Sequence, residues 1–314
     1  MRRAFTFPGQ GSQAVGMGRE LYDAFAAARH VFEEVDDALG EKLSALIFNG
    51  PVEDLTLTQN TQPALMAVSV AAARVIEAES GRKLSAIADF VAGHSLGEYS
   101  ALAAAGAISV ADAARALRIR GQAMQKAVPV GVGAMAALLG VELDVAEAVA
   151  REASAGGEVV AAANDNGGGQ VVISGNKAAV ERASALALER GAKRALPLPV
   201  SAPFHCPLMQ PAADAMAEAL ARIEILPPVV PVIANVTAAP VSDPDTIRDL
   251  LVKQVTGVVR WRESVLRLKA EGVETLVEVG AGKVLTGLVK RIDKELASAT
   301  VNTPADVDAF LKTL

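Results

Sequence analysis

Residues 89–105, DFVAGHSLGEYSALAAA, contain the local pattern that decides the fold. Residues 89–93 are largely apolar and predict a short buried strand, while residues 95–105 predict a helix directly after it. The turn between them carries the G-x-S-x-G motif, GHSLG, at residues 93–97. A serine on a sharp strand-to-helix turn is typical of a nucleophile elbow, so we predict that Ser95 is a nucleophile.

Two features of this turn suit the chemistry of a serine nucleophile. Its glycines let the chain turn sharply and let a neighbouring element approach closely. The helix that follows would place its dipole and free N–H groups beside Ser95, where negative charge develops, and the N–H of Leu96 is the expected oxyanion donor. The simpler interpretation is a serine that only caps the helix, and the motif alone does not exclude it.

A serine hydroxyl needs a base, and the chain contains only three histidines. His30 lies in a predicted amphipathic helix, and the side chain of His94, next to the nucleophile in a tight turn, is expected to point elsewhere. His205 remains, in a loop with prolines at positions 203 and 207. We predict that His205 is the base, with an incidental loop histidine as the alternative. No acidic residue stands out as the third member of a triad.

The alternation of strands and helices predicts an α/β core with a mostly parallel sheet covered on both faces. The pattern changes between residues 130 and 198, where we predict strand 134–140, helix 143–155, strand 158–163, strand 170–174, helix 177–190 and strand 193–197. This βαββαβ order is ferredoxin-like. We therefore predict an inserted ferredoxin-like subdomain at residues 130–198 and a hydrolase-like core made of residues 1–129 and 199–314.

The composition narrows the class of protein. With 314 residues, of which 51% are hydrophobic and 21% charged, the chain is expected to fold around a large core. Its net charge of −6 provides no general attraction to nucleic acid or to an anionic membrane. The single cysteine, Cys206, is interpreted as a buried structural thiol and favours a reducing compartment. We expect a cytoplasmic protein without a membrane segment, a nucleic-acid partner, a metal or another cofactor.

Several motifs together resemble the malonyl-CoA:acyl-carrier-protein transacylase family and follow one another in that family's order. They are FPGQGSQ at 7–13, GHSLGE at 93–98, RIRG at 118–121, QVVISG at 170–175 and SAPFH at 201–205, followed by Gln254 and EVG at 278–280. Each motif is short, but together they cover essentially the whole chain. The resemblance implies the same fold as above, a hydrolase-like α/β core with a ferredoxin-like insertion.

The resemblance also implies roles for the residues around the nucleophile. Ser95 is the nucleophile and His205 its general base. The backbone N–H groups of Gln10 and Leu96 hold the oxyanion. In this family a backbone carbonyl or amide group orients the histidine in place of a triad acid, and here that role falls to Gln254.

Arg120 matches the arginine that pairs with the free carboxylate of the malonyl group. A planar guanidinium grips a carboxylate through two parallel hydrogen bonds, so it would select a dicarboxylic acyl group over acetyl. Without the resemblance, Arg120 is typical of a solvated helix face, because Arg115 and Arg118 belong to the same basic stretch.

Three further residues are expected to contact the substrate. Phe204 precedes the base, and in related polyketide acyltransferases a phenylalanine at that place accompanies malonyl selectivity, because its bulk crowds an α-methyl group. Asn166 lies in NDNGGG at 164–169, a departure from the family's usual form that we interpret as a mobile loop, and it is the candidate contact for coenzyme A. His94 is the third.

The resemblance implies a ping-pong transfer of malonyl from malonyl-CoA, through malonyl-Ser95, to the phosphopantetheine thiol of acyl carrier protein, supplying extender units for fatty acid synthesis. Carrier proteins are acidic, so Lys193 and Arg194 are the first candidates for docking, with Lys283 or the pair Lys290 and Arg291 after them. Ordinary solvated charge is the alternative for each of them. The family-like expectation for the quaternary state is a monomer.

Three other functions stay open. A serine esterase or thioesterase would use the same nucleophile with water as the acceptor, and it would not need Arg120. An acyltransferase that loads a polyketide synthase would differ only in its carrier. A protein without enzymatic activity could retain the fold as a scaffold, although the set of intact site residues argues against it.

Overall fold

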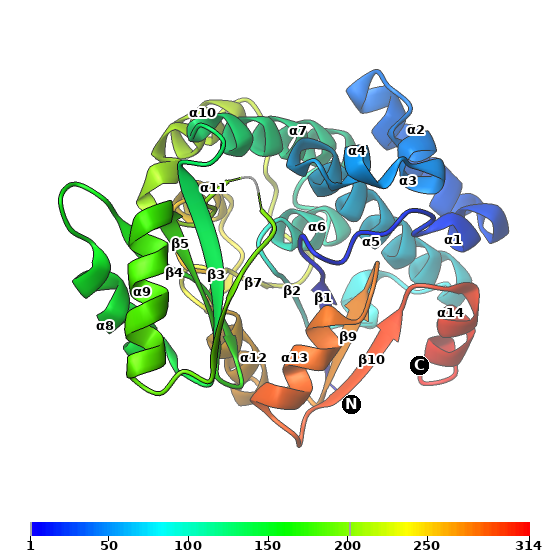
Figure 1. The fold of residues 1–314 in the computed structure, drawn as a ribbon. Helices are drawn as coiled ribbons and strands as arrows, with labels where there is room; N and C mark the ends of the chain where they lie inside the picture. Colours follow the sequence, from blue (N-terminus) through cyan, green and yellow to red (C-terminus); the bar gives the residue numbers. More distant parts are fainter. Residues whose placement is uncertain (1, 201) are drawn as a thin grey trace.

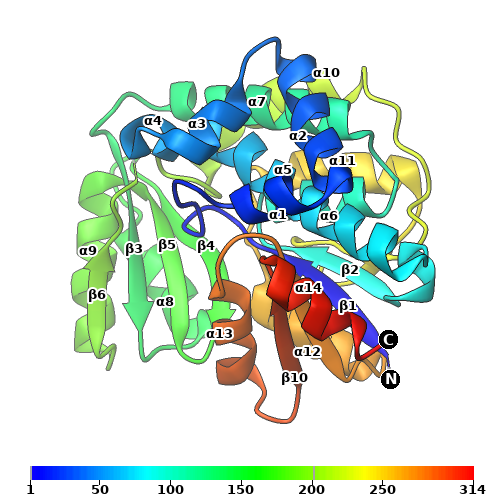
Figure 2. The ribbon, with the colours of Figure 1, turned by 90° about the vertical axis from the view of Figure 1, so that its right-hand side faces the viewer.

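The computed structural model describes residues 2–200 and 202–314, so Ser201 of the SAPFH motif lies outside the described residues. Two separate sheets organise the chain (Figure 1). The larger one belongs to a core in which helices cover both faces. The smaller one forms, with two helices, a unit that lies to one side of that core in both views (Figures 1 and 2).

The larger sheet has the strand order β10-β9-β1-β2-β7-β8, in which every neighbouring pair is parallel except β7 and β8. Its strands are β1 (Arg3–Phe7), β2 (Phe90–Gly93), β7 (Val232–Ile233), β8 (Pro240–Val241), β9 (Thr275–Val279) and β10 (Ala297–Val301). The central strands β1, β2 and β9 are short and almost wholly buried, as expected for parallel strands covered on both faces. The predicted mostly parallel sheet is confirmed.

The helices of the core divide between the two faces of this sheet. On one face α5 is central: most of its residues are buried, and it packs against α2, α6 and α7. On the other face α12 and α13 pack on the strands. The bounds are α1 (Arg19–Ala24), α2 (Ala26–Leu39), α3 (Leu43–Asn49), α4 (Val52–Thr56), α5 (Thr58–Ser80), α6 (Gly97–Ala104), α7 (Val110–Ala127), α10 (Gln210–Leu220), α11 (Pro244–Gln254), α12 (Trp261–Ala270), α13 (Val284–Ile292) and α14 (Pro304–Leu311).

The smaller sheet is antiparallel throughout, with the strand order β4-β5-β3-β6. Its unit consists of β3 (Gly133–Leu139), α8 (Leu143–Ala153), β4 (Val160–Gly167), β5 (Gln170–Asn176), α9 (Lys177–Glu189) and β6 (Arg194–Pro197). A cluster of alanine, valine and leucine side chains joins α8 and α9 to one face of the sheet. The predicted βαββαβ order is therefore present, and the predicted fold class is confirmed. The division at residues 130 and 198 stays a prediction.

The strand β4 is longer than the sequence predicts. The sequence pattern predicts that this strand ends at residue 163 and that residues 164–169 form a loop, but β4 continues to Gly167, and only Gly168 and Gly169 form the turn into β5. The extension is held from the core: the N–H of Asp165 donates to the carbonyl oxygen of Val259 at 2.9 Å. The Asp165 carboxylate, itself buried, pairs with Arg262 at 2.9 Å. These contacts fix the small sheet against the core beside α12.

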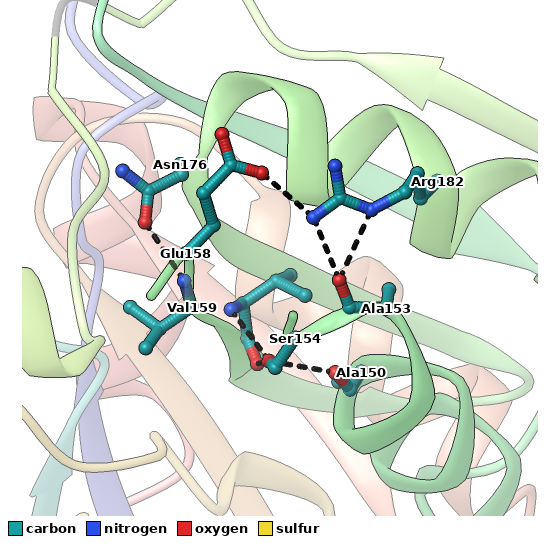
Figure 3. A network of polar contacts seen from close by, with 8 residues as sticks. Ala150, Ala153, Ser154, Glu158, Val159, Asn176 and Arg182 are labelled. Carbon is teal, nitrogen blue, oxygen red and sulfur yellow. Dashed lines mark hydrogen bonds and ion pairs between the residues drawn. The ribbon is translucent and has the colours of Figure 1, made fainter. Parts of the chain in front are cut away.

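A network of polar contacts ties α8 and α9 to the loop between α8 and β4 (Figure 3). Arg182 of α9 donates to the carbonyl oxygen of Ala153 from Nε at 3.1 Å and from Nη2 at 2.8 Å. Its Nη2 also pairs with Glu158 at 2.7 Å. The side-chain oxygen of Asn176 accepts from the N–H of Val159 at 2.8 Å. These contacts give hydrogen-bond partners to backbone groups at the end of α8 and just before β4. They thereby hold α9 and the end of β5 to the loop between α8 and β4.

Candidate active site

The turn that carries Ser95 is held in an unusual backbone conformation. Ser95 has a φ of 53°, in the left-handed region that residues with a Cβ atom rarely adopt. A Cβ atom on Gly93 would lie 1.9 Å from the backbone carbonyl atoms of Gly97, and one on Gly97 would lie 2.2 Å from the carbonyl oxygen of Phe7. Both glycines of the motif are therefore required by close backbone approach. The helix α6 begins at Gly97, so Ser95 lies in the turn just before it.

We expect Gly93→Ala to destabilise the protein by about 3 kcal/mol or more, because both partners of the clash are backbone atoms that cannot move aside. The matched control is Gly287→Ala in α13, where an added Cβ meets no atom within 4 Å and should stabilise the fold by about 0.5–1 kcal/mol. Urea denaturation of the two variants measures both effects. Equal stabilities would show that the elbow is not closely packed.

The predicted base lies in contact with the predicted nucleophile. The Nε2 atom of His205 is 2.7 Å from the Oγ atom of Ser95, and its Nδ1 atom is 2.9 Å from the backbone carbonyl oxygen of Gln254. Since a carbonyl oxygen only accepts, Nδ1 must carry the proton, and Nε2 then presents its lone pair to the serine hydroxyl. The backbone carbonyl of Gln254 thus occupies the position that a carboxylate has in a Ser-His-Asp triad.

The surroundings of His205 keep its imidazole neutral. Burial lowers the pKa of His205 to about 3, and the nearby positive charge of Arg120 acts in the same direction. The hydrogen bond to Gln254 opposes this shift but is the smaller effect. A neutral imidazole can take the serine proton, so the base is available throughout the neutral pH range.

We expect the imidazole of His205 to stay unprotonated from pH 8 down to pH 5. An unperturbed histidine titrates near pH 6.5, but a pKa of about 3 places the gain of the proton well below this range. NMR titration of histidine-labelled protein measures it, with His205→Asn identifying the signal. A titration midpoint near pH 6.5 for that signal would contradict the account of the base.

Arg120 of α7 is buried beside the nucleophile, with a relative exposure of 1%. Its Nη1 donates to the side-chain oxygen of Gln62 at 2.7 Å, and its Nη2 donates to the side-chain oxygen of Gln254 at 2.9 Å and to the Oγ atom of Ser95 at 3.2 Å. All these partners are neutral. Across residues 2–200 and 202–314, no salt bridge to Arg120 is found and its Nε has no hydrogen-bond partner. A buried guanidinium with neutral partners favours an anionic substrate group.

A buried carboxyl group stands behind these residues. Glu98, in the first turn of α6, accepts a hydrogen bond from the Nε2 atom of Gln254 at 2.8 Å and one from the backbone N–H of Asn235 at 3.1 Å. Burial raises the pKa of Glu98 to about 7, and the two hydrogen bonds and the charge of Arg120 oppose that rise. The site therefore holds a second titratable group close to its arginine.

Ser95, His205 and Arg120 open into one cavity of about 130 Å³. A second cavity of about 470 Å³ shares Gln10, His94, Asn164 and Leu198 with the first and extends to α13. The remaining residues of the inner cavity are Gln62, Leu96, Met124, Met135, Val200 and Phe204. The small inner cavity thus holds the nucleophile and its base, and the larger outer one continues from it toward α13.

The two residues predicted to bind the oxyanion through their backbone N–H groups lie at the inner cavity. Both Gln10 and Leu96 line the inner cavity, and within the described ranges neither N–H has a backbone acceptor. The side chain of Gln10 is fixed by Thr58, whose hydroxyl donates to it at 2.6 Å. The N–H of Ser95 itself is not free, because it donates to the side-chain oxygen of Asn235 at 2.8 Å.

Two further residues that were predicted to contact the substrate, His94 and Asn166, contact each other. The Nε2 atom of His94 lies 2.8 Å from the side-chain oxygen of Asn166, and the ring of His94 packs against Trp261. His94 belongs to the core and Asn166 to β4, so the contact joins the two units. Both residues line the outer cavity. Phe204, with a relative exposure of 9%, lines the inner one.

Three residues of this site have no role in the sequence analysis. Gln62 and Asn235 are single amides outside any recognised motif, so the sequence offers no signal for them. Glu98 ends the GHSLGE motif, and its position two residues after Leu96 could have indicated a buried role at the start of the helix. The cysteine next to the base, Cys206, is buried, and burial raises the pKa of its thiol, in agreement with a structural role.

No helix in the described part of the chain is long and apolar enough to cross a membrane. The same residues contain no group of three or more His, Cys, Asp or Glu side chains that could hold a metal ion.

Comparisons with known proteins cover the whole chain. Residues 4–307 match the acyl transferase domain family. The malonyl CoA-acyl carrier protein transacylase of Bacillus subtilis strain 168 is 49% identical over 99% of this chain and 96% of its own length. The crystal structure of an acyl-carrier-protein S-malonyltransferase from Bartonella henselae has a TM-score of 0.97 and 57% identity, covering 100% of this chain and 99% of its own. A malonyl-transacylase in complex with its type II PKS acyl-carrier protein has a TM-score of 0.95 and 46% identity, with full coverage of both chains.

Proposed function

The chain belongs to the acyl transferase family, and we propose on this premise that it moves a malonyl group from malonyl-CoA to acyl carrier protein for fatty acid synthesis. The family resemblance predicted from the motifs is confirmed. The enzyme is thus an acyltransferase of the S-malonyltransferase type. The substrate class is inferred mainly from Arg120. Its guanidinium is buried, has neutral partners, and places Nη2 3.2 Å from the Oγ atom of the nucleophile.

The first half of the proposed reaction acylates the serine. Ser95 loses its proton to Nε2 of His205 as its Oγ attacks the thioester carbonyl carbon of malonyl-CoA. The N–H groups of Gln10 and Leu96 stabilise the oxyanion, and one such donor contributes about 3 kcal/mol to the transition state. When the intermediate collapses, the C–S bond breaks, and the coenzyme A thiolate takes the proton from His205. The product is malonyl-Ser95.

The second half repeats these steps with the carrier. The phosphopantetheine thiol of the carrier gives its proton to His205 and attacks the ester carbonyl of malonyl-Ser95. Collapse of the second tetrahedral intermediate releases the Oγ atom of Ser95, which regains the proton from Nε2. Each half returns the imidazole to its neutral form, which agrees with the low pKa of His205.

Arg120 and Phe204 account for the choice of acyl group in this proposal. The malonyl carboxylate pairs with the guanidinium of Arg120, whereas an acetyl group would leave that buried charge unpaired. The ring of Phe204 lines the inner cavity, and its bulk is proposed to crowd an α-methyl branch. His94 and Asn166 line the outer cavity, and we assign them to the coenzyme A or phosphopantetheine arm.

A serine hydrolase would also use Ser95 and His205, but it has no use for the buried Arg120. A scaffold without activity would not need a 2.7 Å contact between the nucleophile and its base.

The natural carrier of this enzyme is also a proposal. One related malonyl-transacylase is in complex with a type II PKS acyl-carrier protein, whereas we propose a carrier of fatty acid synthesis for this chain. We propose a monomer as the quaternary state, because Ser95, His205 and Arg120 meet within a single chain and need no residue from another copy. The single cysteine supports the cytoplasm as its location.

Basic side chains gather where the outer cavity ends. Lys283 and Arg291 line this cavity. Arg291 lies at the β4–β5 turn, because a Cβ atom on Gly168 would be 2.7 Å from it. Lys193 lies near the same turn, because a Cβ atom on Gly140 would be 2.9 Å from it and the N–H of Gly140 donates to the carbonyl oxygen of Gly169. Lys193, Arg194, Lys283 and Arg291 are all exposed. We assign these four residues as the docking face for the acidic carrier.

We expect Lys283→Glu combined with Arg291→Glu to raise the KM for acyl carrier protein about tenfold at low salt, and less at high salt, because opposite charges speed the encounter of the two proteins. The rate of Ser95 acylation at saturating malonyl-CoA should not change. Lys312→Glu, on the exposed end of the chain beyond α14, is the matched control. An unchanged KM for the carrier in the double variant would contradict this docking face.

The experiment that tests the function is a two-stage assay. Without carrier, malonyl-CoA should release coenzyme A in a burst of one equivalent per enzyme and then stop. Addition of phosphopantetheinylated acyl carrier protein should start steady turnover and produce malonyl carrier. Continuous coenzyme A release without any carrier would instead support the hydrolase.

A further inference from the structure

The backbone of the nucleophile turn is clamped by one side chain. Asn235 follows β7 and has a relative exposure of 1%. Its Oδ1 accepts the N–H of Ser95 at 2.8 Å, and its Nδ2 donates to the carbonyl oxygen of Gly93 at 2.6 Å. A single amide therefore satisfies one backbone acceptor and one backbone donor, in the residues just before and just after His94. A non-glycine residue with a φ of 53° persists where its surroundings fix it, and this amide supplies two of the required contacts.

A second side chain joins this clamp to the base. The Oε2 atom of Glu98 accepts the backbone N–H of Asn235 at 3.1 Å and the Nε2 of Gln254 at 2.8 Å. The same Nε2 donates to the carbonyl oxygen of Ser95 at 2.9 Å. The backbone carbonyl of Gln254 in turn orients His205 at 2.9 Å. One buried acceptor thus connects the residue that clamps the nucleophile with the residue that orients the base.

We propose that Asn235 and Glu98 are positioning residues, which hold Ser95 in its left-handed conformation and set its distance from His205. This inference rests on the proposed function, because it concerns the rate at which Ser95 is acylated. The clamp has a second consequence: Asn235 occupies the N–H of Ser95, so the oxyanion is confined to the N–H groups of Leu96 and Gln10. Neither side chain of the pair lines the inner cavity, so neither touches the substrate.

The requirement on Glu98 is an acceptor rather than a charge. Both of its hydrogen bonds converge on the same oxygen, Oε2, and both donors are neutral amides. A glutamine at this position keeps one such oxygen, whereas a leucine of similar size keeps none. The pair Glu98→Gln and Glu98→Leu therefore separates the hydrogen bonds from the charge and from the volume.

The experiment measures single-turnover acylation of Ser95 by malonyl-CoA in the full chain, with KM and thermal stability recorded for each variant. Asn235→Ala and Glu98→Leu should each slow acylation about 100-fold, the scale of an error of about 1 Å in the reacting geometry, with an unchanged KM for malonyl-CoA. Glu98→Gln should restore the rate to within about threefold of the wild type, since it keeps the acceptor. The control is Asn49→Ala, an exposed asparagine at the end of α3.

The outcomes are distinct. Acylation of Asn235→Ala within threefold of the wild type overturns the inference, as does a Glu98→Gln variant that is as slow as Glu98→Leu. A raised KM together with a lower melting temperature in every slow variant assigns both residues to general stability and also overturns it. If Glu98→Leu does not fold, Asn235→Ala and Glu98→Gln still decide. Failure of the wild type to form malonyl-Ser95 refutes the proposed function instead, so the two failures are told apart.

Discussion

Replacement of Ser95 by alanine should lower malonyl transfer by about 10⁴- to 10⁶-fold, the range that removal of a serine nucleophile produces in serine hydrolases. The variant keeps the cavity, His205 and Arg120, so binding of malonyl-CoA should persist while the covalent step disappears. The release of coenzyme A, measured by chromatography with and without carrier protein, reports both stages of the reaction.

Ser100→Ala is the matched control for this variant. Ser100 lies in α6, the helix that begins just after Ser95, is fully buried, and its hydroxyl has no hydrogen-bond partner among the residues that the structure describes. Its removal should therefore leave transfer within about twofold of the wild type, as expected when no interaction is lost. Transfer that survives in Ser95→Ala at a tenth of the normal rate would mean that another group accepts the malonyl moiety.

Arg120→Ala should lower kcat/KM for malonyl-CoA about 1,000-fold, which corresponds to the loss of a buried ion pair of about 4 kcal/mol. The reaction with acetyl-CoA should fall far less or rise, because acetyl has no carboxylate to bind and the variant removes the unpaired buried charge. The ratio of the two specificity constants is therefore the measured quantity. Arg120→Lys should recover only part of it, since an ammonium group cannot form the bidentate pair.

Arg118→Ala provides the control on the same helix. Arg118 lies two residues away but binds the backbone carbonyl oxygen of Gln59 at 2.9 Å and pairs with Asn60 and Glu41 instead of facing the cavity. Its loss should reduce stability without changing the ratio of malonyl to acetyl transfer. An Arg120→Ala variant that still prefers malonyl-CoA would place the carboxylate site elsewhere.

The sequence is sufficient to predict the parts of this molecule that depend on local pattern. The turn around Ser95 can be predicted from the sequence, because close backbone contacts at Gly93 and Gly97 allow only glycine at these two positions. The βαββαβ order of the small unit can be predicted because its strands and helices have clear apolar periodicity. His205 is found by elimination, since the chain has so few histidines.

The parts that depend on distant contacts could not be predicted from local pattern. The burial of Arg120 results from the packing of α7 against α5, which brings Gln62 to its guanidinium across 58 residues of sequence. The group that orients His205 is a backbone carbonyl, which any residue type supplies, so Gln254 has no signature of its own. The strand β4 extends through Asn164 and Asp165, residue types that strands disfavour, because partners from the core satisfy them.

Short elements of the core also leave little pattern in the sequence. The helices α3 and α4 contain seven and five residues, too few for a helical period to stand out. The strand β10 and the helix α14 follow one another at the end of the chain, and the edge strand pairs with β9 along its whole length although only Val301 of its residues is buried. Tertiary pairing thus decides these elements.

The measurement that tests the central claim most directly is the intact mass of the protein after brief exposure to malonyl-CoA, acetyl-CoA and methylmalonyl-CoA in parallel. We predict a mass increase of one malonyl group with malonyl-CoA alone, located on Ser95 by peptide mapping and absent from Ser95→Ala. No adduct with any of the three donors, accompanied by release of free malonate, would contradict the acyl-enzyme and identify a hydrolase.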